Sequence, residues 1–107
     1  MLFIETPYFT RFCEEHCGDE DLRSLQDLLL KRPDAGDLMT GTKGLRKLRW
    51  ALPGRGKRGG ARVIYYWRSA EGRIYLLYAY AKNVQSDLTD AQRKLLVQWI
   101  SKELDDE

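Results

Sequence analysis

One stretch decides the fold of this chain: Arg62-Val-Ile-Tyr-Tyr-Trp-Arg-Ser-Ala-Glu-Gly-Arg-Ile-Tyr-Leu-Leu-Tyr-Ala-Tyr-Ala81. Its two halves, 62–68 and 73–81, are rich in the aromatic and β-branched residues that favour strands. The four residues between them, Ser69-Ala-Glu-Gly72, have the length of a hairpin connection. The stretch therefore predicts two neighbouring antiparallel strands at the centre of a sheet.

A third strand is predicted just before this hairpin, where two kinds of side chain alternate. In residues 45–51, Leu48 and Trp50 fall on one face of a strand, and Lys47 and Arg49 fall on the other. One face of this strand is therefore expected to be buried, while the opposite face presents a basic row.

Two helices are predicted upstream of these strands. Leu2 to Glu5 is a short strand, and Thr6-Pro7 is typical of a helix N-cap followed by proline at the first helical position. Gly18 ends this helix, Asp19 is expected to cap the next one, and Pro33 stops it. The residues at helical spacing are Phe9, Phe12, Cys13 and His16 in the first helix and Leu22, Leu25, Leu28 and Leu29 in the second.

The chain is expected to close with a third helix. It begins within Ser86–Thr89, and Thr89 and Gln92 have the spacing of a capping box. Its expected buried stripe consists of Leu95, Leu96, Trp99, Ile100 and Leu104. The acidic tail, 105–107, lies at the negative end of the helix dipole and should fray. The order of elements predicts one α+β domain spanning residues 1–107, with two N-terminal helices and one C-terminal helix on a twisted, mainly antiparallel sheet.

Length and composition agree with one globular domain. The 107 residues suffice for a single core, and 43% are hydrophobic and 32% charged, unlike a disordered chain. The longest apolar run, Ile74 to Ala81, is far shorter than the roughly 20 residues of a membrane-spanning helix. The N-terminus lacks the basic region and apolar stretch of a signal peptide, so we expect a cytoplasmic location and no membrane partner.

Cys13, His16 and Cys17 lie close together but are not expected to bind a metal. They provide three ligands where a tetrahedral zinc site needs four, and cytosolic thiols usually stay reduced. We interpret both cysteines as small apolar residues along a helix, and we expect neither a metal nor a cofactor. His16 is the only histidine of the chain, which excludes catalytic pairs of histidines.

The net charge is only +2, but the cations are concentrated in one segment. Residues 38–70 contain no Asp or Glu, and they include a glycine-rich run, 53–60, that predicts a mobile loop. The segment holds half of the 18 basic side chains: Lys43, Arg46, Lys47, Arg49, Arg55, Lys57, Arg58, Arg62 and Arg68. Aromatic residues interleave with them, and phosphates pair with cations while bases stack on aromatic rings. The pattern favours a polyanion-binding surface over a merely solvated face.

Spacing excludes several kinds of catalytic site. The glycine-rich run matches neither a P-loop nor a dinucleotide fingerprint, and the basic segment has no carboxylates for two-metal chemistry. Metal-free cleavage of RNA remains, because the ribose 2′-hydroxyl can attack the adjacent phosphate. A lysine among other cations can act as the base, and the candidates are Lys82, Lys57 and Lys47.

Four segments carry a family resemblance: Gly44-Leu-Arg-Lys-Leu-Arg49, Gly54-Arg-Gly-Lys-Arg-Gly-Gly60, Arg62-Val-Ile-Tyr-Tyr66, and Tyr80-Ala-Lys-Asn83 with Asp87-Leu-Thr89. In this order and spacing they resemble the RelE/HigB superfamily of bacterial toxins, most closely its HigB-like branch. The resemblance covers nearly the whole chain. It implies a ribosome-dependent mRNA endonuclease that cuts the message in the ribosomal decoding site. It also implies inhibition by a cognate antitoxin, which we expect to be of the helix-turn-helix type.

The resemblance further implies site residues. The expected catalytic residues are Arg62, Lys82 and Asn83, and those expected to bind RNA or the ribosome are Lys47, Arg49, Arg55, Lys57 and Arg58. The best-studied branch has a catalytic tyrosine near the start of the last helix, where this chain has Leu88 or Thr89, so Tyr65 or Tyr80 is a candidate substitute. Simpler interpretations are a solvated strand residue for Arg62, a solubilising residue for Lys82 and a turn residue for Asn83.

Two other functions fit the same residues. A ParE-like toxin resembles this architecture but acts on DNA gyrase, and the basic segment favours RNA over that target. A non-catalytic module would bind phosphate with the basic loop alone. Cleavage of a message that occurs only with ribosomes would distinguish the first function from both alternatives.

Overall fold

The computed structural model describes residues 1–52 and 60–105, which form a five-stranded sheet with three α-helices. The elements are β1 (Leu2–Glu5), α1 (Pro7–His16), α2 (Asp19–Lys31), β2 (Asp37–Leu38), β3 (Arg46–Trp50), β4 (Ala61–Arg68), β5 (Arg73–Ala81) and α3 (Asp90–Asp105). The strand order is β1-β5-β4-β3-β2, with β1 parallel to β5 and the other neighbours antiparallel. The α+β class and the mainly antiparallel sheet are confirmed. Within the described ranges no helix is long and apolar enough to cross a bilayer.

β4 and β5 form the hairpin expected at the centre of the sheet. They are joined by one turn of 3₁₀ helix, Ser69–Glu71, followed by Gly72 at a φ of 64°. A Cβ at Gly72 would meet nothing within 4 Å. The left-handed backbone, and not a lack of space, therefore favours glycine at this turn.

A β-bulge changes which side chains of β5 share a face. The register of the hairpin shifts between Ile64 and Tyr65, which leaves Leu77 as an extra residue on β5. As a result Leu77 and Tyr80, three residues apart, lie in the same buried cluster, and Tyr78 packs against that cluster too. Strict alternation would have placed Tyr78 and Tyr80 on the other face from Leu77.

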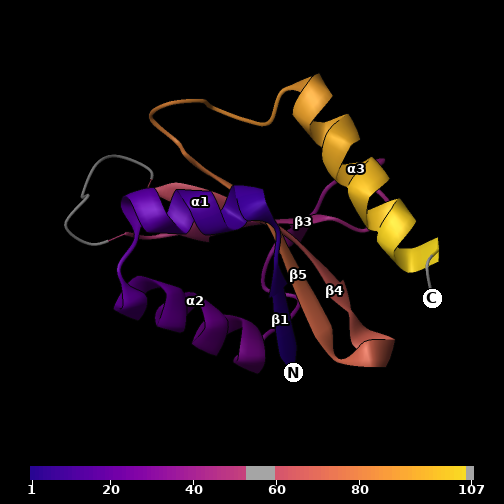
Figure 1. Cartoon of the computed structure of the whole chain (residues 1–107), viewed down its shortest axis with the longest axis horizontal. Coiled ribbons are helices and arrows are strands. Elements are labelled where there is room, and N and C mark those ends of the chain that lie inside the picture. Colours follow the sequence, from indigo (N-terminus) through magenta and orange to yellow (C-terminus); the bar gives the residue numbers. More distant parts are fainter. Residues whose placement is uncertain (53–59, 106–107) are drawn as a thin grey trace.

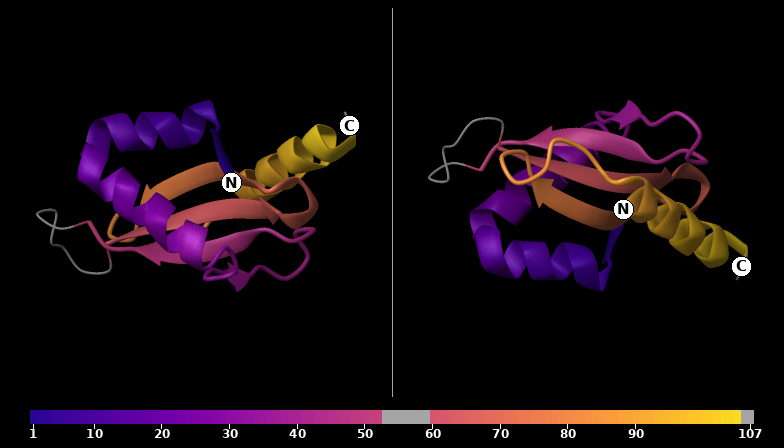
Figure 2. Two further views of the ribbon diagram at one scale, coloured as in Figure 1. Left: turned by 90° about the horizontal axis from the view of Figure 1, so that it is seen from below. Right: turned by 90° about the horizontal axis from the view of Figure 1, so that it is seen from above.

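The two faces of the sheet carry separate buried clusters. The α1–α2 pair covers one face and α3 covers part of the other, and Figures 1 and 2 show the pair and α3 well apart. The first cluster contains Phe9, Phe12, Leu25, Leu29, Trp50, Leu52, Ala61, Val63, Tyr65, Ile74, Leu76 and Ala79. The second contains Met39, Leu45, Ile64, Tyr75, Leu77, Tyr80, Leu88, Leu96 and Ile100.

The start of α1 is as expected, whereas that of α2 differs. Thr6 caps α1 by accepting a hydrogen bond from the backbone N–H of Phe9 at 3.2 Å, with Pro7 as the first helical residue. The predicted cap of α2 at Asp19 is wrong, because Gly18 is the N-cap. The Asp21 carboxylate accepts from the Gly18 N–H at 2.9 Å, so a side chain from the first turn satisfies this backbone donor.

The start of α3 is as expected, whereas two leucines differ from expectation. α3 begins at Asp90, directly after the segment 86–89 predicted to begin it, and the reciprocal hydrogen bonds of Thr89 and Gln92 confirm the capping box. Leu28 and Leu95, expected in buried stripes, are 40% and 43% exposed. Both leucines lie at the edge of the buried face of their helix. The spacing of apolar residues does not show how wide that buried face is.

The structure adds a strand that the sequence analysis missed. β2 is only two residues long and pairs with Arg46 and Lys47 of β3. The segment before it is held by Tyr65, whose hydroxyl donates to the Pro33 carbonyl and accepts from the Gly36 N–H, both at 2.8 Å. A Cβ on Gly36 would come within 2.8 Å of the Tyr65 ring, so glycine permits this approach.

Candidate functional site

A row of two arginines and a tyrosine crosses three strands on the face that α3 covers only in part. Arg62 on β4 lies directly opposite Arg49 on β3 and directly opposite Tyr80 on β5. Residues directly opposite one another in a sheet share a face, so these three side chains stand side by side. We call Arg49, Arg62 and Tyr80 the cationic row.

The two arginines of the cationic row have the same charge in directly opposed positions. Such a pair is destabilising by itself, and a bound anion relieves the repulsion. Arg49 is exposed and Arg62 is half-buried, so both sides of the pair reach solvent. The arrangement therefore suits an anionic group such as a phosphate, which a guanidinium can bind through two parallel hydrogen bonds.

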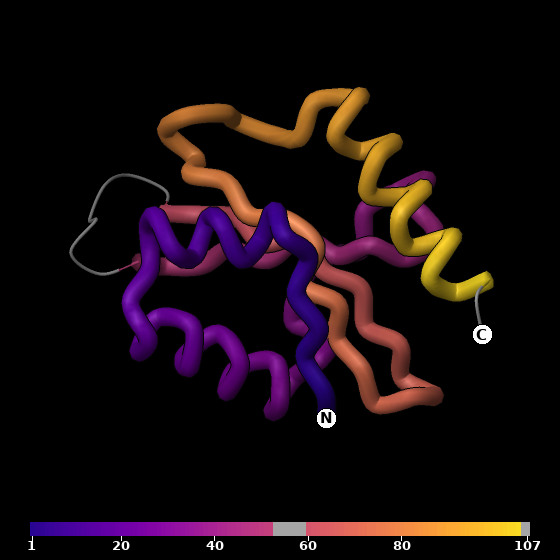
Figure 3. Tube along the Cα trace, in the orientation of Figure 1, coloured from indigo at the N-terminus to yellow at the C-terminus, as the bar shows by residue number. Residues whose placement is uncertain are grey.

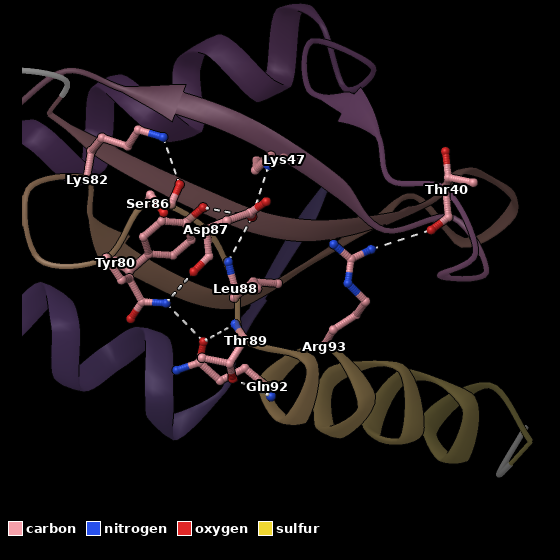
Figure 4. Close-up of polar contacts among 11 residues, drawn as sticks. Thr40, Lys47, Tyr80, Lys82, Ser86, Asp87, Leu88, Thr89, Gln92 and Arg93 are labelled. Atoms are coloured by element: carbon pink, nitrogen blue, oxygen red, sulfur yellow. Dashed lines mark hydrogen bonds and ion pairs between the residues drawn. The ribbon is translucent and has the colours of Figure 1, made fainter.

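A carboxylate joins the cationic row to the neighbouring lysine of β3. Oδ1 of Asp87 lies 3.1 Å from Nζ of Lys47, 3.5 Å from the hydroxyl of Tyr80 and 2.8 Å from the backbone N of Leu88, as Figure 4 shows. Lys47 and Asp87 are 40 residues apart in the chain. The network thus ties the start of α3 to the middle of the sheet.

Asp87 lies in the connection from β5 to α3, which Figure 3 shows as the orange segment at the top of the molecule. Nζ of Lys82 donates to the Ser86 carbonyl at 2.7 Å, and Nε2 of Gln85 donates to the Asp87 carbonyl at 2.8 Å and to Oε1 of Gln92 at 3.0 Å. These bonds fold the connection back on itself. They hold the backbone on both sides of Asp87 where the carboxylate reaches Lys47 and Tyr80.

The electrostatics of the network set the charge states of two groups. The backbone N–H of Leu88 and the ammonium of Lys47 lower the pKa of Asp87, so it is a carboxylate at neutral pH. Burial, and next the charge of Asp87, raise the pKa of Tyr80 to about 12, although the nearby Arg62 opposes this shift. At neutral pH the site therefore holds a proton acceptor and a proton donor side by side.

The structure separates the two tyrosines that the sequence left as alternatives. Tyr65 is fully buried against the α1–α2 pair, and its hydroxyl is occupied by the Pro33 and Gly36 backbone. Tyr80 lies on the opposite face beside Arg62 and Asp87. Of the two, Tyr80 is the one with access to the cationic row.

The other predicted site residues fall into three groups. Lys47, Arg49 and Arg62 come together on one face, and Lys82, with its amine on the Ser86 carbonyl, lies beside Tyr80 and Asp87 (Figure 4). Asn83 is exposed in the turn that follows Lys82. The remaining three, Arg55, Lys57 and Arg58, lie outside the described residues.

Asp87 is the residue that the sequence analysis did not assign to the site. The sequence analysis named Asp87 only as part of a motif that carries the family resemblance. No local pattern in the sequence indicates that Asp87 reaches a lysine on β3. The one available signal was its place as an acidic residue between a basic turn and a helix cap. Among the residues that the structure describes, no group of three or more His, Cys, Asp and Glu is arranged to hold a metal ion.

The two cysteines lie away from the cationic row. Cys13 and Cys17 are free, half-buried thiols packed against the α1–α2 cluster. A hydrogen bond with Cys17, and next burial, raise the pKa of Cys13, which keeps it a thiol. Both observations agree with their interpretation as small apolar residues.

Two comparisons with known proteins bear on the family and on the fold. The family model described as "RelE toxin of RelE / RelB toxin-antitoxin system" matches residues 3–106. Among solved structures, a double arginine-to-alanine mutant of the E. coli toxin RelE in the free state matches with a TM-score of 0.55. The match covers 79% of this chain and 86% of that chain at 11% identity. At this identity the solved structure supports the fold alone.

Proposed function

This chain belongs to the RelE toxin family, and we propose that it is an endoribonuclease that cuts messenger RNA on the ribosome and so inhibits translation. As a toxin of a toxin–antitoxin system it has an antitoxin as its partner. The cytoplasmic location, the HigB-like branch and an antitoxin of the helix-turn-helix type are parts of the same proposal. The HigB-like branch and the antitoxin type rest on the sequence resemblance.

One observation carries the proposal: Arg49 and Arg62 occupy directly opposed strand positions, next to the neutral phenol of Tyr80 and the carboxylate of Asp87. Cleavage of RNA by its own 2′-hydroxyl needs donors for the negative charge on phosphorus, a proton acceptor and a proton donor. Arg49 and Arg62 are the proposed charge donors, and Arg62 lies closer to the acid and base because it is paired directly with Tyr80.

We assign the proton acceptor to Asp87 and the proton donor to Tyr80. The 2′-oxygen forms a bond to phosphorus while the bond from phosphorus to the 5′-oxygen breaks, which leaves a 2′,3′-cyclic phosphate and a 5′-hydroxyl. The 2′-hydroxyl proton passes to the Asp87 carboxylate, and Tyr80 gives its proton to the leaving 5′-oxygen. The 3.5 Å contact between the two groups then lets the proton return from Asp87 to Tyr80.

The lysines have a binding role in this proposal. Lys47 forms an ion pair with Asp87, and Lys82 donates a hydrogen bond to the Ser86 carbonyl. In this proposal each lysine therefore lies beside the reacting phosphate as a fixed cation. Asn83 is a proposed contact to the substrate from the exposed turn. Arg55, Lys57 and Arg58 are proposed contacts to the ribosome.

The decisive experiment adds the purified protein to a translated message with and without ribosomes. We expect cuts that appear only with ribosomes and carry a 2′,3′-cyclic phosphate at the new end. Affinity for the ribosome should fall steeply with salt, with a slope of log affinity against log salt of magnitude above about 3, because each phosphate contact releases counterions. Intact message together with inhibited DNA gyrase would refute the proposal in favour of a ParE-like activity.

A further inference from the structure

Three tyrosines form a continuous series from the cationic row to the surface. The rings of Tyr80 and Tyr78, on β5, have centroids 6.4 Å apart, and those of Tyr78 and Tyr8, in the first turn of α1, are 6.2 Å apart. Tyr80 is buried, Tyr78 is half-buried and Tyr8 is 43% exposed. We call Tyr8, Tyr78 and Tyr80 the tyrosine series.

The inner two rings of the series are held in place by hydrogen bonds. Nε2 of Gln92 donates to the Tyr78 hydroxyl at 2.9 Å, and Gln92 is itself fixed by the capping box of α3. The Tyr80 hydroxyl contacts Asp87. Since these side chains are already held in place, binding of a ligand to them costs the protein little conformational entropy.

The packing of the protein core does not require an aromatic residue at the outer end. Tyr8 belongs to neither of the two buried clusters, and it is the only member of the series classed as exposed. Its aromatic contact is Tyr78, which packs at the margin of the second cluster. Tyr8 therefore extends the aromatic surface outward from the sheet toward solvent.

The register of the sheet sets the distance between this surface and the cationic row. Tyr80 is paired with Arg62, and Tyr78 is paired with Ile64 in the next position of the same face. Two residues along a strand span roughly 6–7 Å. A nucleotide chain with one phosphate at Arg62 would thus bring the adjoining base to Tyr78 and Tyr8.

We propose that Tyr8 and Tyr78 form a stacking subsite for the nucleobase next to the phosphate held by the cationic row. The subsite rests on the proposed function for its substrate, single-stranded RNA. Nucleobases stack on aromatic side chains with little regard to sequence, so the subsite positions the strand and influences where it is cut. It has no role in proton transfer.

The first test compares two replacements of the exposed ring. Tyr8→Leu keeps apolar bulk but removes the aromatic face, and it should weaken binding of a short single-stranded RNA about tenfold and change the distribution of cuts on a translated message. Tyr8→Phe should restore both. Tyr66→Leu is the control, because the ring of Tyr66 is half-buried against Tyr75, which is not a member of the series. Wild-type binding and cutting by Tyr8→Leu would overturn the proposal.

The second test does not depend on activity. In protein labelled with fluorotyrosine, the resonances of Tyr8 and Tyr78 should shift when the same RNA is added, while that of Tyr66 should stay. If these shifts occur but wild-type protein cuts no message, the subsite stands and the proposed function fails. If Tyr8→Leu binds and cuts RNA normally but escapes its antitoxin, the surface is a protein contact and the subsite is refuted.

Discussion

Replacing Arg62 by alanine should separate activity from stability. We expect the single-turnover rate of message cleavage to fall by about 10²–10³, as it does when one preorganised donor to a developing negative charge is removed. Arg62→Lys should recover little of the rate, because an ammonium cannot reproduce the two parallel hydrogen bonds of a guanidinium.

The effect on stability follows from what Arg62 touches. It faces Arg49 directly, so alanine relieves a like-charge contact worth about 0.2–1 kcal/mol, while it removes the hydrogen bond from Nη1 of Arg62 to the Ala61 carbonyl at 3.1 Å. The replacement also removes a half-buried aliphatic stem, which acts in the opposite direction. We therefore expect the free energy of unfolding to change by less than about 0.5 kcal/mol and the melting temperature by less than about 4 °C.

The assay measures cleavage on ribosomes at saturating protein together with a thermal melt of each variant. Arg46→Ala is the matched control on the same sheet, because the Arg46 guanidinium donates to the Asp34 and Gly36 carbonyls at 3.2 and 2.8 Å. It should cost about 1–2 kcal/mol of stability and leave cleavage per folded molecule unchanged. If Arg62→Ala melts many degrees lower and its rate falls only in proportion, Arg62 is a structural residue and the reasoning is wrong.

Three further outcomes are expected. The rate of the cleavage step should be flat between about pH 5 and 8, because the pKa of Asp87 is lowered from its ordinary value and the carboxylate is already deprotonated there. A lysine base would instead raise the rate about tenfold per pH unit. Tyr80→Phe should slow cleavage by about 10²–10⁴ without weakening ribosome binding, and an unchanged rate would remove Tyr80 as the proton donor. Tyr65→Phe should leave the Gly36 N–H and the Pro33 carbonyl without their partner and cost about 1–3 kcal/mol in denaturant melts, while cleavage by the folded protein persists. Loss of cleavage by folded Tyr65→Phe protein would place Tyr65 in the site.

Much of the fold was predictable because its signals are local. The alternation at Lys47 to Trp50, the connection at Ser69 to Gly72 and the cap at Thr6 each involve residues a few positions apart, and the corresponding elements form where the sequence predicts them. Errors arose where a local pattern permits more than one answer. Asp19 and Gly18 can both begin a helix, and the side chain of Asp21 decided between them.

The members of the candidate site were only partly predictable. Alternation places Lys47 and Arg49 on one face, but the alignment of Arg62 with Arg49 depends on the strand register. The bulge at Leu77 depends on how β4 and β5 pack, and it turns Tyr80 toward Arg62. A short sequence pattern does not encode such a shift, because its energetic cost and benefit arise between strands.

The sequence by itself determined the order of the three helices and of four of the five strands, the segregation of cations into residues 38–70 and the alternation of β3, since these follow from neighbouring residues. Only the tertiary structure decided that Asp87 meets Lys47 and that Tyr8 meets Tyr78, 70 positions away in the chain. Contacts of this kind depend on the path of the connecting segments and on the packing of both faces of the sheet. They are fixed when the whole core forms, and no local preference specifies them.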